Sequence, residues 1–331
     1  MNIAVIGAGL SGLTVARQLQ AQGHHITVYE KSADVSGRMA SRQTELGAFD
    51  HGAQYMTGTS ERFKKEIADW KKMGWITAWN PRLVTLEQGE AKPAGRSAHR
   101  YVAVPSMNGL GRQLAHGLDI RKEQRVVALE KWEGRWLLKL ASPEVAIPAS
   151  AGPFDAVVMA LPADQAFTLL AIAPKLQQQI RPVNMAPCWA LMLGFQDSLE
   201  LPFDAAWVQH SRLSWIARDT SKPGHRLGDR WILHATPGWS REHLEDDPER
   251  VRDKLSKAFH EATDSWVQPI YAVTHLWRFA QAEHTLEMDC LWNASLGIGI
   301  CGDWFSNGLE GAGRIENAFL SGLALSKEIT S

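Results

Sequence analysis

Six residues near the start of the chain constrain its fold more than any other feature: Gly7-Ala8-Gly9-Leu10-Ser11-Gly12. They follow a short apolar run at residues 3–6 and precede apolar residues that recur at helical spacing as far as Gly23. In a strand–turn–helix unit the three glycines permit a tight turn, the approach of backbone to a pyrophosphate, and close packing of helix on strand. The helix N-terminus adds free N–H groups and a positive dipole. The segment therefore predicts a dinucleotide-binding site.

A second apolar run, residues 26–29, completes a βαβ unit and ends at Glu30. An acidic residue at this point, eighteen residues beyond Gly12, can accept hydrogen bonds from an adenosine ribose and disfavours a 2′-phosphate. We therefore place Leu10, Ser11, Glu30 and Lys31 with the glycines among the predicted cofactor contacts.

The chain has 331 residues, with 35 Lys and Arg against 36 Asp and Glu, so its formal net charge is -1. This length predicts about two domains. A balanced charge without long runs of one sign argues against nucleic acid or an anionic membrane as a partner. We expect a cytoplasmic protein, because the three cysteines are widely spaced and no secretory signal is found at the start. No apolar segment is long enough to span a membrane. No metal-ligand spacing is found, so we expect no metal, and the oligomeric state stays open.

The remaining patterns indicate an α/β fold with two interleaved domains. Glu133-Gly134 between two apolar runs is typical of a hairpin and predicts a β-meander beside the parallel sheet. Residues 154–160 are typical of a buried strand, residues 61–74 of a charged helix, and residues 75–100 of an irregular insertion. We assign residues 1–57, 97–162 and 280–331 to a discontinuous Rossmann-type domain, and residues 58–96 and 163–279 to a mixed α/β substrate domain.

Two further segments point to flavin. Ser36-Gly37-Arg38-Met39 resembles the Gly-Gly-Arg motif of the flavin amine oxidase superfamily, with Ser36 in place of the first glycine. That resemblance implies that Arg38 neutralises the pyrophosphate and that Gly37 and Met39 lie against the cofactor. Gly302-Asp303 resembles the second flavin signature of the superfamily, in which the aspartate binds the ribitol chain. Trp304 would then pass beside the isoalloxazine, and Glu310-Gly311-Ala312 would begin a helix aimed at its pyrimidine side.

Four more segments, in this order along the chain, resemble the renalase family and its bacterial members: Phe49-Asp50-His51-Gly52-Ala53-Gln54-Tyr55, residues 102–109, residues 234–240 and residues 277–281. The resemblance implies an architecture like that of amine oxidases and p-hydroxybenzoate hydroxylase. It also implies an FAD oxidase that converts the 2- and 6-dihydro isomers of NAD(P) to NAD(P)+. Hydride would pass to flavin N5 without a general base, and O2 would be reduced to H2O2.

Such a reaction needs a flat apolar slot, and the chain is rich in tryptophan, with 14 Trp against 10 Phe. We predict that Trp277 and Trp304 form the slot. Gln54 and Tyr55, which we also place against the cofactor, together with His234 and Arg278, are the polar groups expected to orient the substrate. Residues 215–218 would bring Arg218 to the mouth of the pocket.

Two alternatives share these cofactor motifs. One is a flavin amine oxidase or dehydrogenase for a small amine, and the other is a flavin-binding redox sensor without turnover. Some related enzymes bind flavin covalently through cysteine, but Cys301 precedes the Gly302-Asp303 pair, so we expect noncovalent FAD.

Overall fold

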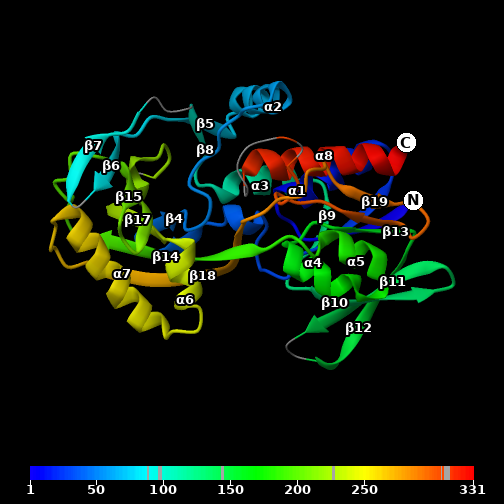
Figure 1. Cartoon of the computed structure of the whole chain (residues 1–331). Helices are drawn as coiled ribbons and strands as arrows, with labels where there is room; N and C mark the ends of the chain where they lie inside the picture. Colours follow the sequence, from blue (N-terminus) through cyan, green and yellow to red (C-terminus); the bar gives the residue numbers. More distant parts are fainter. Residues whose placement is uncertain (88, 96–98, 143–144, 226–227, 307, 309–313) are drawn as a thin grey trace.

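A computed structural model describes residues 1–87, 89–95, 99–142, 145–225, 228–306, 308 and 314–331. The molecule has two halves side by side, and both termini lie in the same half, at the right of Figure 1. Each half is built on its own large β-sheet.

The half that holds the termini contains a six-stranded sheet in the order β19 (Leu291–Asn293), β20 (Ile298–Ile300), β13 (Ala156–Met159), β1 (Asn2–Ile6), β2 (His25–Tyr29), β9 (Asp119–Arg121). All neighbouring strands pair in parallel except β19 and β20. The sequence runs from β1 to β2 on one side and returns to β13 on the other. The carboxyl end of β1 is therefore the switch point at which ligands bind in such sheets.

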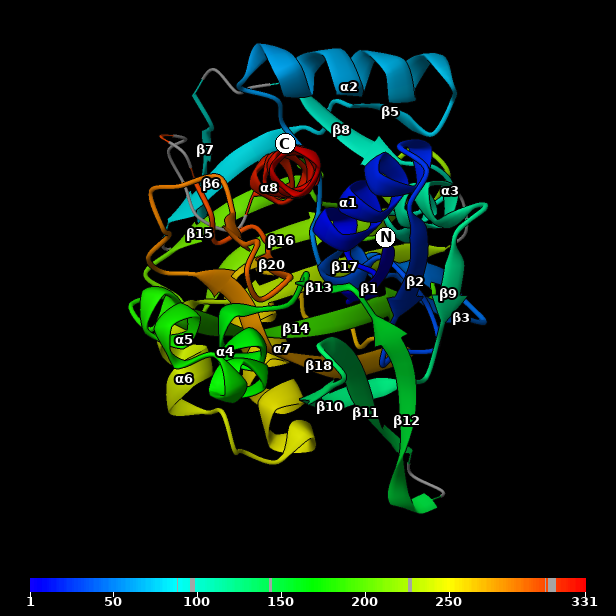
Figure 2. The same cartoon turned by 90° about the vertical axis from the view of Figure 1, so that its right-hand side faces the viewer.

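Other elements cover both faces of this sheet, so β1 is buried on both sides. Ile3 and Val5 pack in one core with α1 (Leu10–Ala21), α3 (Asn108–Ala115) and α8 (Ile315–Thr330). Ala4 and Ile6 pack in a second core under a meander of three strands and under a short helical segment. Figure 2 shows α1 and α8 side by side, with the meander on the opposite side of the sheet.

The meander is the predicted one. Its strands are β10 (Arg125–Trp132), β11 (Arg135–Ser142) and β12 (Val145–Phe154), joined in antiparallel pairs. Glu133 and Gly134 form the two-residue turn between the first two, and both have positive φ, as a type I′ hairpin requires. The helical segment beside it consists of α4 (Ala163–Leu169), η2 (Leu170–Ile172) and α5 (Pro174–Ile180).

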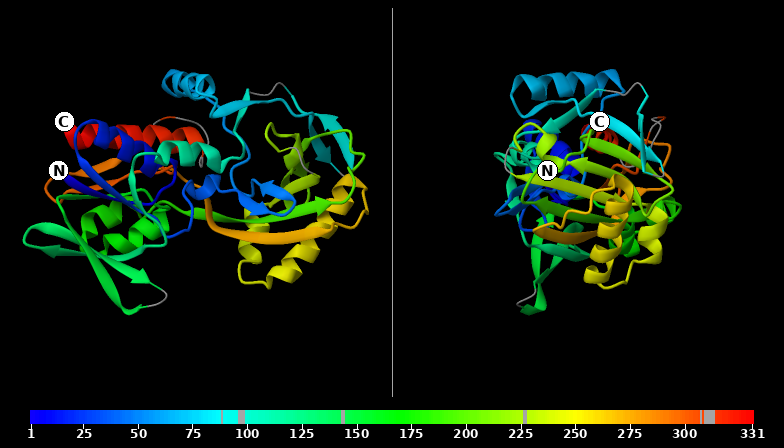
Figure 3. Two further views of the ribbon diagram at one scale, coloured as in Figure 1. Left: turned by 180° about the vertical axis from the view of Figure 1, so that it is seen from behind. Right: turned by 90° about the vertical axis from the view of Figure 1, so that its left-hand side faces the viewer.

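The other half is built on a seven-stranded sheet in the order β18 (Tyr271–Ala282), β14 (Met185–Phe195), β17 (Asp229–Ala235), β16 (Leu213–Arg218), β15 (Ala205–Gln209), β6 (Leu83–Glu87), β7 (Glu90–Pro93). Helix α7 (Pro248–Thr263) packs on one face against Leu191 and Leu193 of β14. Seen from behind, α7 and α6 (Pro237–Glu242) lie on one side of this sheet (Figure 3). Cys188, Ala190 and Met192 alternate with these leucines and so lie on the opposite face.

Smaller elements complete the described chain: η1 (Gly37–Met39), β3 (Arg42–Thr44), β4 (Gly47–Phe49), α2 (Glu61–Lys72), β5 (Ile76–Trp79), β8 (Arg100–Ala103) and η3 (Asp219–Ser221). The prediction that residues 75–100 are irregular was wrong, because they contain β5, β6 and β7. Strand β5 pairs with β8, and β6 joins the large sheet in parallel beside β15. Both pairings are with partners distant in the sequence, so local composition gave no indication of them.

The α/β fold class is confirmed, whereas the domain boundaries stay a prediction. Within the described residues, no helix has both the length and the apolar character needed to cross a membrane.

The packing of α8 on α1 generates a test of this fold. A Cβ added at Gly322 of α8 would lie 2.4 Å from the backbone oxygen of Ser11 in α1. We expect Gly322→Ala to lower the free energy of unfolding by about 1–3 kcal/mol, because the helices must separate. Urea unfolding measures this. Gly238→Ala in α6 is the control, since an added Cβ there meets no atom within 4 Å. Equal effects at the two positions would contradict the packing argument.

Candidate functional site

A cavity of about 1650 Å³ extends from the carboxyl end of β1 to the face of the seven-stranded sheet. Ligand pockets commonly measure roughly 300–1,000 Å³. The cavity therefore has room for an extended dinucleotide and a second molecule beside it. Its lining comes from both halves of the protein.

The predicted glycine turn forms one end of the cavity. Gly7 has φ +102°, and a Cβ there would lie 2.4 Å from the backbone oxygen of Ala160. A Cβ at Gly12 would lie 2.0 Å from the oxygen of Gly7, so only glycine allows this packing of helix on strand. Gly9 faces open space, and no side chain of the described residues caps the N-terminus of α1. The first N–H groups of the helix are thus available to a phosphate, and the turn fits a dinucleotide.

Glu30 lies in the cavity wall next to this turn and is buried. Its Oε2 accepts a hydrogen bond from the backbone N–H of Ala8 at 2.9 Å, and its Oε1 accepts one from Ser32 at 2.8 Å. A carboxylate oxygen can accept more than one hydrogen bond, so Glu30 can also receive a ribose hydroxyl. Lys31, Leu10 and Ser11 also line the cavity.

The Ser36-Gly37-Arg38-Met39 segment lies directly against the glycine turn. Ser36 has φ +90°, a conformation that favours glycine, and its hydroxyl donates to the backbone oxygen of Asn108. A glycine at this position, as in the Gly-Gly-Arg motif that the segment resembles, would adopt the same conformation without strain. Gly37 packs with its Cα side against Gly9, and Arg38 and Met39 line the cavity.

Arg38 joins the two predicted flavin signatures. Its NH1 donates to Oδ2 of Asp303 at 2.7 Å and to the backbone oxygen of Ala280 at 3.0 Å, and its NH2 donates to Oδ1 of Asp303. Three of its five N–H groups are thus used, and two remain for a phosphate. Gly302 and Asp303 both line the cavity. Glu310, Gly311 and Ala312 lie outside the described residues.

Trp304 does not form the predicted slot. Its side chain is fully buried in the core, where it stacks on Phe305, and its Nε1 donates to the backbone oxygen of Leu161 at 2.9 Å. It is not among the residues that line the cavity. The hydrogen bond to Leu161 satisfies the buried indole N–H and holds the ring in the core, away from the cavity.

Trp277 does line the cavity, on the seven-stranded sheet. Its ring stacks on His51 at 5.2 Å between centroids, and its Nε1 donates to the backbone oxygen of His51 at 3.1 Å. His275, two residues earlier on β18, packs edge-on against both rings. Burial lowers the pKa of His51 and His275 to about 4, so both imidazoles are neutral near pH 7. These three residues form an uncharged aromatic group in the cavity wall.

The other predicted substrate residues occupy different environments, although all line the cavity. Gln54 is buried, and its amide already bonds to the backbone oxygens of Asp50 and Gly52 and to Lys222. Burial lowers the pKa of His234 to about 4, and its Nε2 lies 3.1 Å from the oxygen of His51.

Tyr55 stands at a tilt beside Trp79 and Trp215. Arg278 is exposed and forms a two-point ion pair with Glu245, so it belongs to the outer rim.

Arg218 does not reach the mouth of the cavity, contrary to our expectation. Trp215 lines the cavity, and Arg218 stands three residues later on β16, hence on the opposite face. Its guanidinium lies over Trp231 and donates to the oxygen of Leu199.

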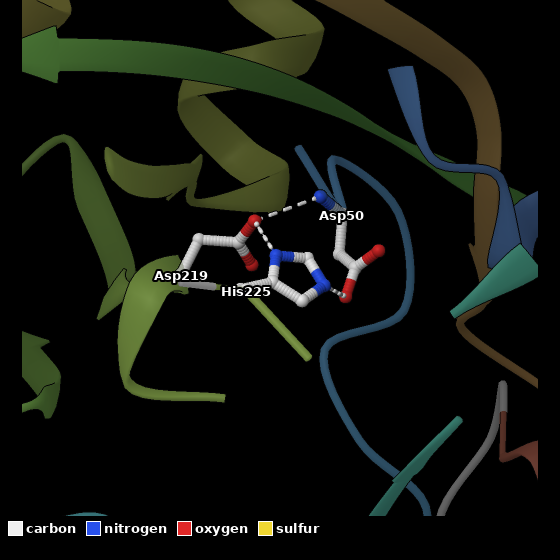
Figure 4. A group of neighbouring side chains, drawn as sticks. All are labelled: Asp50, Asp219 and His225. Atoms are coloured by element: carbon white, nitrogen blue, oxygen red, sulfur yellow. Dashed lines mark hydrogen bonds and ion pairs between the residues drawn. The ribbon is translucent and has the colours of Figure 1, made fainter. Parts of the chain in front are cut away.

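A buried group of charges lies behind Gln54. Figure 4 shows His225 between Asp219 and Asp50, with its Nδ1 3.1 Å from Asp219 and its Nε2 3.4 Å from Asp50. The Nζ of Lys222 lies 2.8 Å from Asp219 and 3.3 Å from Asp50. We call these four residues the charge cluster. The carboxylates and the imidazole are close enough to hold a metal ion, but the ammonium of Lys222 already supplies the cation.

The cluster keeps its members charged. Burial opposes ionisation of every member, but the opposite charges outweigh it. Lys222 and His225 hold the pKa of Asp219 below its ordinary value, and the pKa of Lys222 is raised. Burial also acts against His225, yet its hydrogen bonds to Asp219 and Asp50 raise its pKa to about 9. The two anions and two cations of the cluster thus stay ionised at pH 7, and the buried guanidinium of Arg230 lies next to them, 3.5 Å from Nδ1 of His225.

Sequence reasoning missed His51, His275 and the whole charge cluster. His51 and Asp50 lie inside a segment that we had singled out, and His275 shares a strand face with Trp277, so alternation along the strand could have found it. Nothing in the sequence relates Asp50 to residues 219–225, because no local pattern links segments about 170 residues apart.

The pKa of His225 generates a test of the cluster. A histidine whose pKa is raised on folding adds stability that is complete below its unfolded value of 6.5 and is lost as pH rises through about 9. We expect wild type to exceed His225→Gln in unfolding free energy by up to about 3 kcal/mol near pH 6, with a smaller difference near pH 10. Urea unfolding at several pH values measures this. The exposed His116→Gln is the control, and a difference that grows with pH would contradict the cluster.

Comparisons with known proteins agree with this geometry. Residues 5–69 match the model of an NAD(P)-binding Rossmann-like domain, and residues 95–330 match that of flavin containing amine oxidoreductases. A 52-residue stretch is 46% identical to 4,4′-diapophytoene desaturases of Staphylococcus aureus and Staphylococcus haemolyticus. That stretch is 16% of this chain and only a tenth of the length of those relatives.

Solved structures share the fold over almost the whole chain. A candidate protoporphyrinogen oxidase from Exiguobacterium sp. 255-15 superposes with a TM-score of 0.75 and 13% identity, and covers 99% of this chain and 98% of its own. A triple mutant of putrescine oxidase superposes with a TM-score of 0.71 and 10% identity, with the same coverage. At these identities the likeness shows the fold alone. Because one family model matches more than half of the chain, the protein belongs to the flavin containing amine oxidoreductase family.

Proposed function

We propose that the protein is an FAD-dependent oxidase that converts the 2- and 6-dihydro isomers of NAD(P) to NAD(P)+, with FAD bound noncovalently. The main support for this choice of substrate is the charge of the residues that line the cavity. We define the substrate half as the lining residues from the seven-stranded sheet together with residues 51–57 and Arg100. Among the described residues of this half there is no carboxylate, whereas Arg100 is present, and Glu245 balances the charge of Arg278 at the rim. Such a lining favours an uncharged ring that carries phosphate over a cationic amine.

The residues of this half meet the needs of that reaction. The aromatic rings of Trp277, His51 and His275 offer contact surface to a dihydronicotinamide ring, and the neutral imidazoles place no positive charge against the pyridinium that forms. Positioning of the two reactants is the main contribution required, because the lone pair of the ring nitrogen expels the hydride. When bound, the flavin accepts this hydride, and O2 with one proton takes up the two electrons as H2O2.

The cysteines support noncovalent attachment. Burial raises the pKa of Cys188, which lines the cavity, to about 12, and the pKa of Cys301 is equally high. A thiol that stays protonated at neutral pH is a poor nucleophile. Neither residue is therefore suited to form a bond to the cofactor.

An amine substrate is the second candidate, because tryptophan faces such as those of Trp277 and Trp215 can hold an ammonium group by cation–π attraction. A redox sensor without turnover would show bound FAD that neither class of compound reduces.

Anaerobic mixing of the FAD-loaded protein with borohydride-reduced NAD, a mixture of dihydro isomers, tests the proposal. We expect rapid bleaching of the visible flavin band, no bleaching by authentic 4-dihydro-NADH, and return of the band with peroxide when air is admitted. Bleaching by amines alone would replace this proposal with the second candidate.

The Trp277→Ala variant gives a second prediction in the same assay. It should slow the bleaching by tenfold or more and leave the flavin bound, since the substrate ring loses its contact surface.

Retention of the cofactor gives a separate prediction. Glu30→Ala removes the predicted ribose acceptor and the carboxylate that fixes Ala8 in the glycine turn. We expect FAD to bind about tenfold more weakly or worse, measured as flavin retained after dialysis. Glu130→Ala is the control, because that exposed carboxylate pairs with Lys139 on the meander and does not line the cavity. Full flavin content in Glu30→Ala would reject the assignment.

A further inference from the structure

Arg100 is a buried cation that lines the cavity and has no anionic partner within the described part of the chain. Only 9% of the residue is exposed, and its Nε is enclosed without an acceptor. No hydrogen bond or ion pair of its guanidinium is found among the residues that the structure describes. The group lies over the ring of Tyr55, with its Cζ 4.9 Å from the ring centroid.

The backbone holds Arg100 at this place. It begins β8, where it stands opposite Trp79 of β5. The next residue, Tyr101, exchanges two backbone hydrogen bonds with Met56, at 2.8 and 2.9 Å. The start of β8 is therefore fixed beside the segment that carries Tyr55, and the arginine is held at the cavity wall.

The other described arginines that line the cavity are either paired with a carboxylate or exposed to solvent. Arg38 pairs with Asp303, Arg278 with Glu245, and Arg314 with Glu316. Arg125 is exposed to solvent and needs no partner. Arg100 alone among these combines burial with the absence of a carboxylate.

A buried charge without a partner costs several kcal/mol, and proteins compensate it with an ion or a ligand. Guanidinium presents a planar fork of N–H donors that matches the oxygens of a phosphate. The ring of Tyr55 lies against the guanidinium and would shield one side of such a pair from water.

We propose that Arg100 is the phosphate-binding residue of the substrate half, which takes the phosphate of the dihydronicotinamide nucleotide. The identity of the substrate rests on the proposed function, whereas the anion site does not. The arrangement implies that a nucleotide is preferred to the corresponding riboside. An aromatic surface around Trp277 would receive the ring, and Arg100 the phosphate.

The first arm of the test measures binding without turnover. Inorganic phosphate is titrated into the FAD-loaded protein, and the tryptophan fluorescence is followed. We expect saturable binding to wild type, roughly 10- to 100-fold weaker binding to Arg100→Gln, and an intermediate affinity for Arg100→Lys, which keeps the charge but loses the fork. Arg212→Gln, on the exposed loop before β16, is the control that keeps wild-type affinity.

The second arm compares borohydride-reduced nicotinamide mononucleotide with borohydride-reduced nicotinamide riboside as flavin reductants. Arg100→Gln should raise the half-saturating concentration of the mononucleotide by roughly 10- to 100-fold and leave that of the riboside within about twofold. Equal losses for the two compounds, or equal phosphate binding by wild type and Arg100→Gln, would overturn the proposal. If phosphate binding depends on Arg100 but neither compound reduces the flavin, the anion site stands and the proposed function fails.

Discussion

The ammonium of Lys222 and the imidazole of His225 hold the segment that follows β4 from inside the protein. Both bind Asp50 of that segment and Asp219 of the seven-stranded half, and all four groups are buried. Removing one partner of such a group leaves an uncompensated charge, which typically costs about 3–5 kcal/mol. The cluster therefore fixes the segment after β4 to residues 219–225, and the wall of the cavity depends on its geometry.

Hydrogen bonds connect the charge cluster to the wall of the cavity. Lys222 donates to Gln54, whose amide bonds to the backbone on either side of His51. The oxygen of His51 then accepts a hydrogen bond from Trp277 at 3.1 Å. The aromatic surface of the substrate half is thus oriented by a chain of hydrogen bonds that starts at the charge cluster. Gln54, predicted to orient substrate, has its amide committed to this chain.

The two ends of the cavity differ in their chemistry because they come from different sheets. The end at β1 carries free backbone N–H groups, a buried carboxylate and the Arg38–Asp303 pair, which suits phosphates and ribose hydroxyls. The other end carries aromatic rings, neutral imidazoles and Arg100, and its described lining has no carboxylate. A site assembled this way separates the binding of a polar cofactor from the positioning of a flat substrate.

The local sequence determined those parts of the protein whose physics is local. The glycine turn, the βαβ unit, the Glu133-Gly134 hairpin and the position of Glu30 follow from steric limits and spacing within about thirty residues. Tertiary structure alone decided which tryptophan faces the cavity, since Trp277 and Trp304 look alike in sequence but differ in the acceptor that each indole N–H finds. It also decided that Asp50 meets His225 and that Arg100 meets no acid among the residues that the structure describes. Burial and pairing of charges depend on contacts between distant segments, which no local pattern encodes.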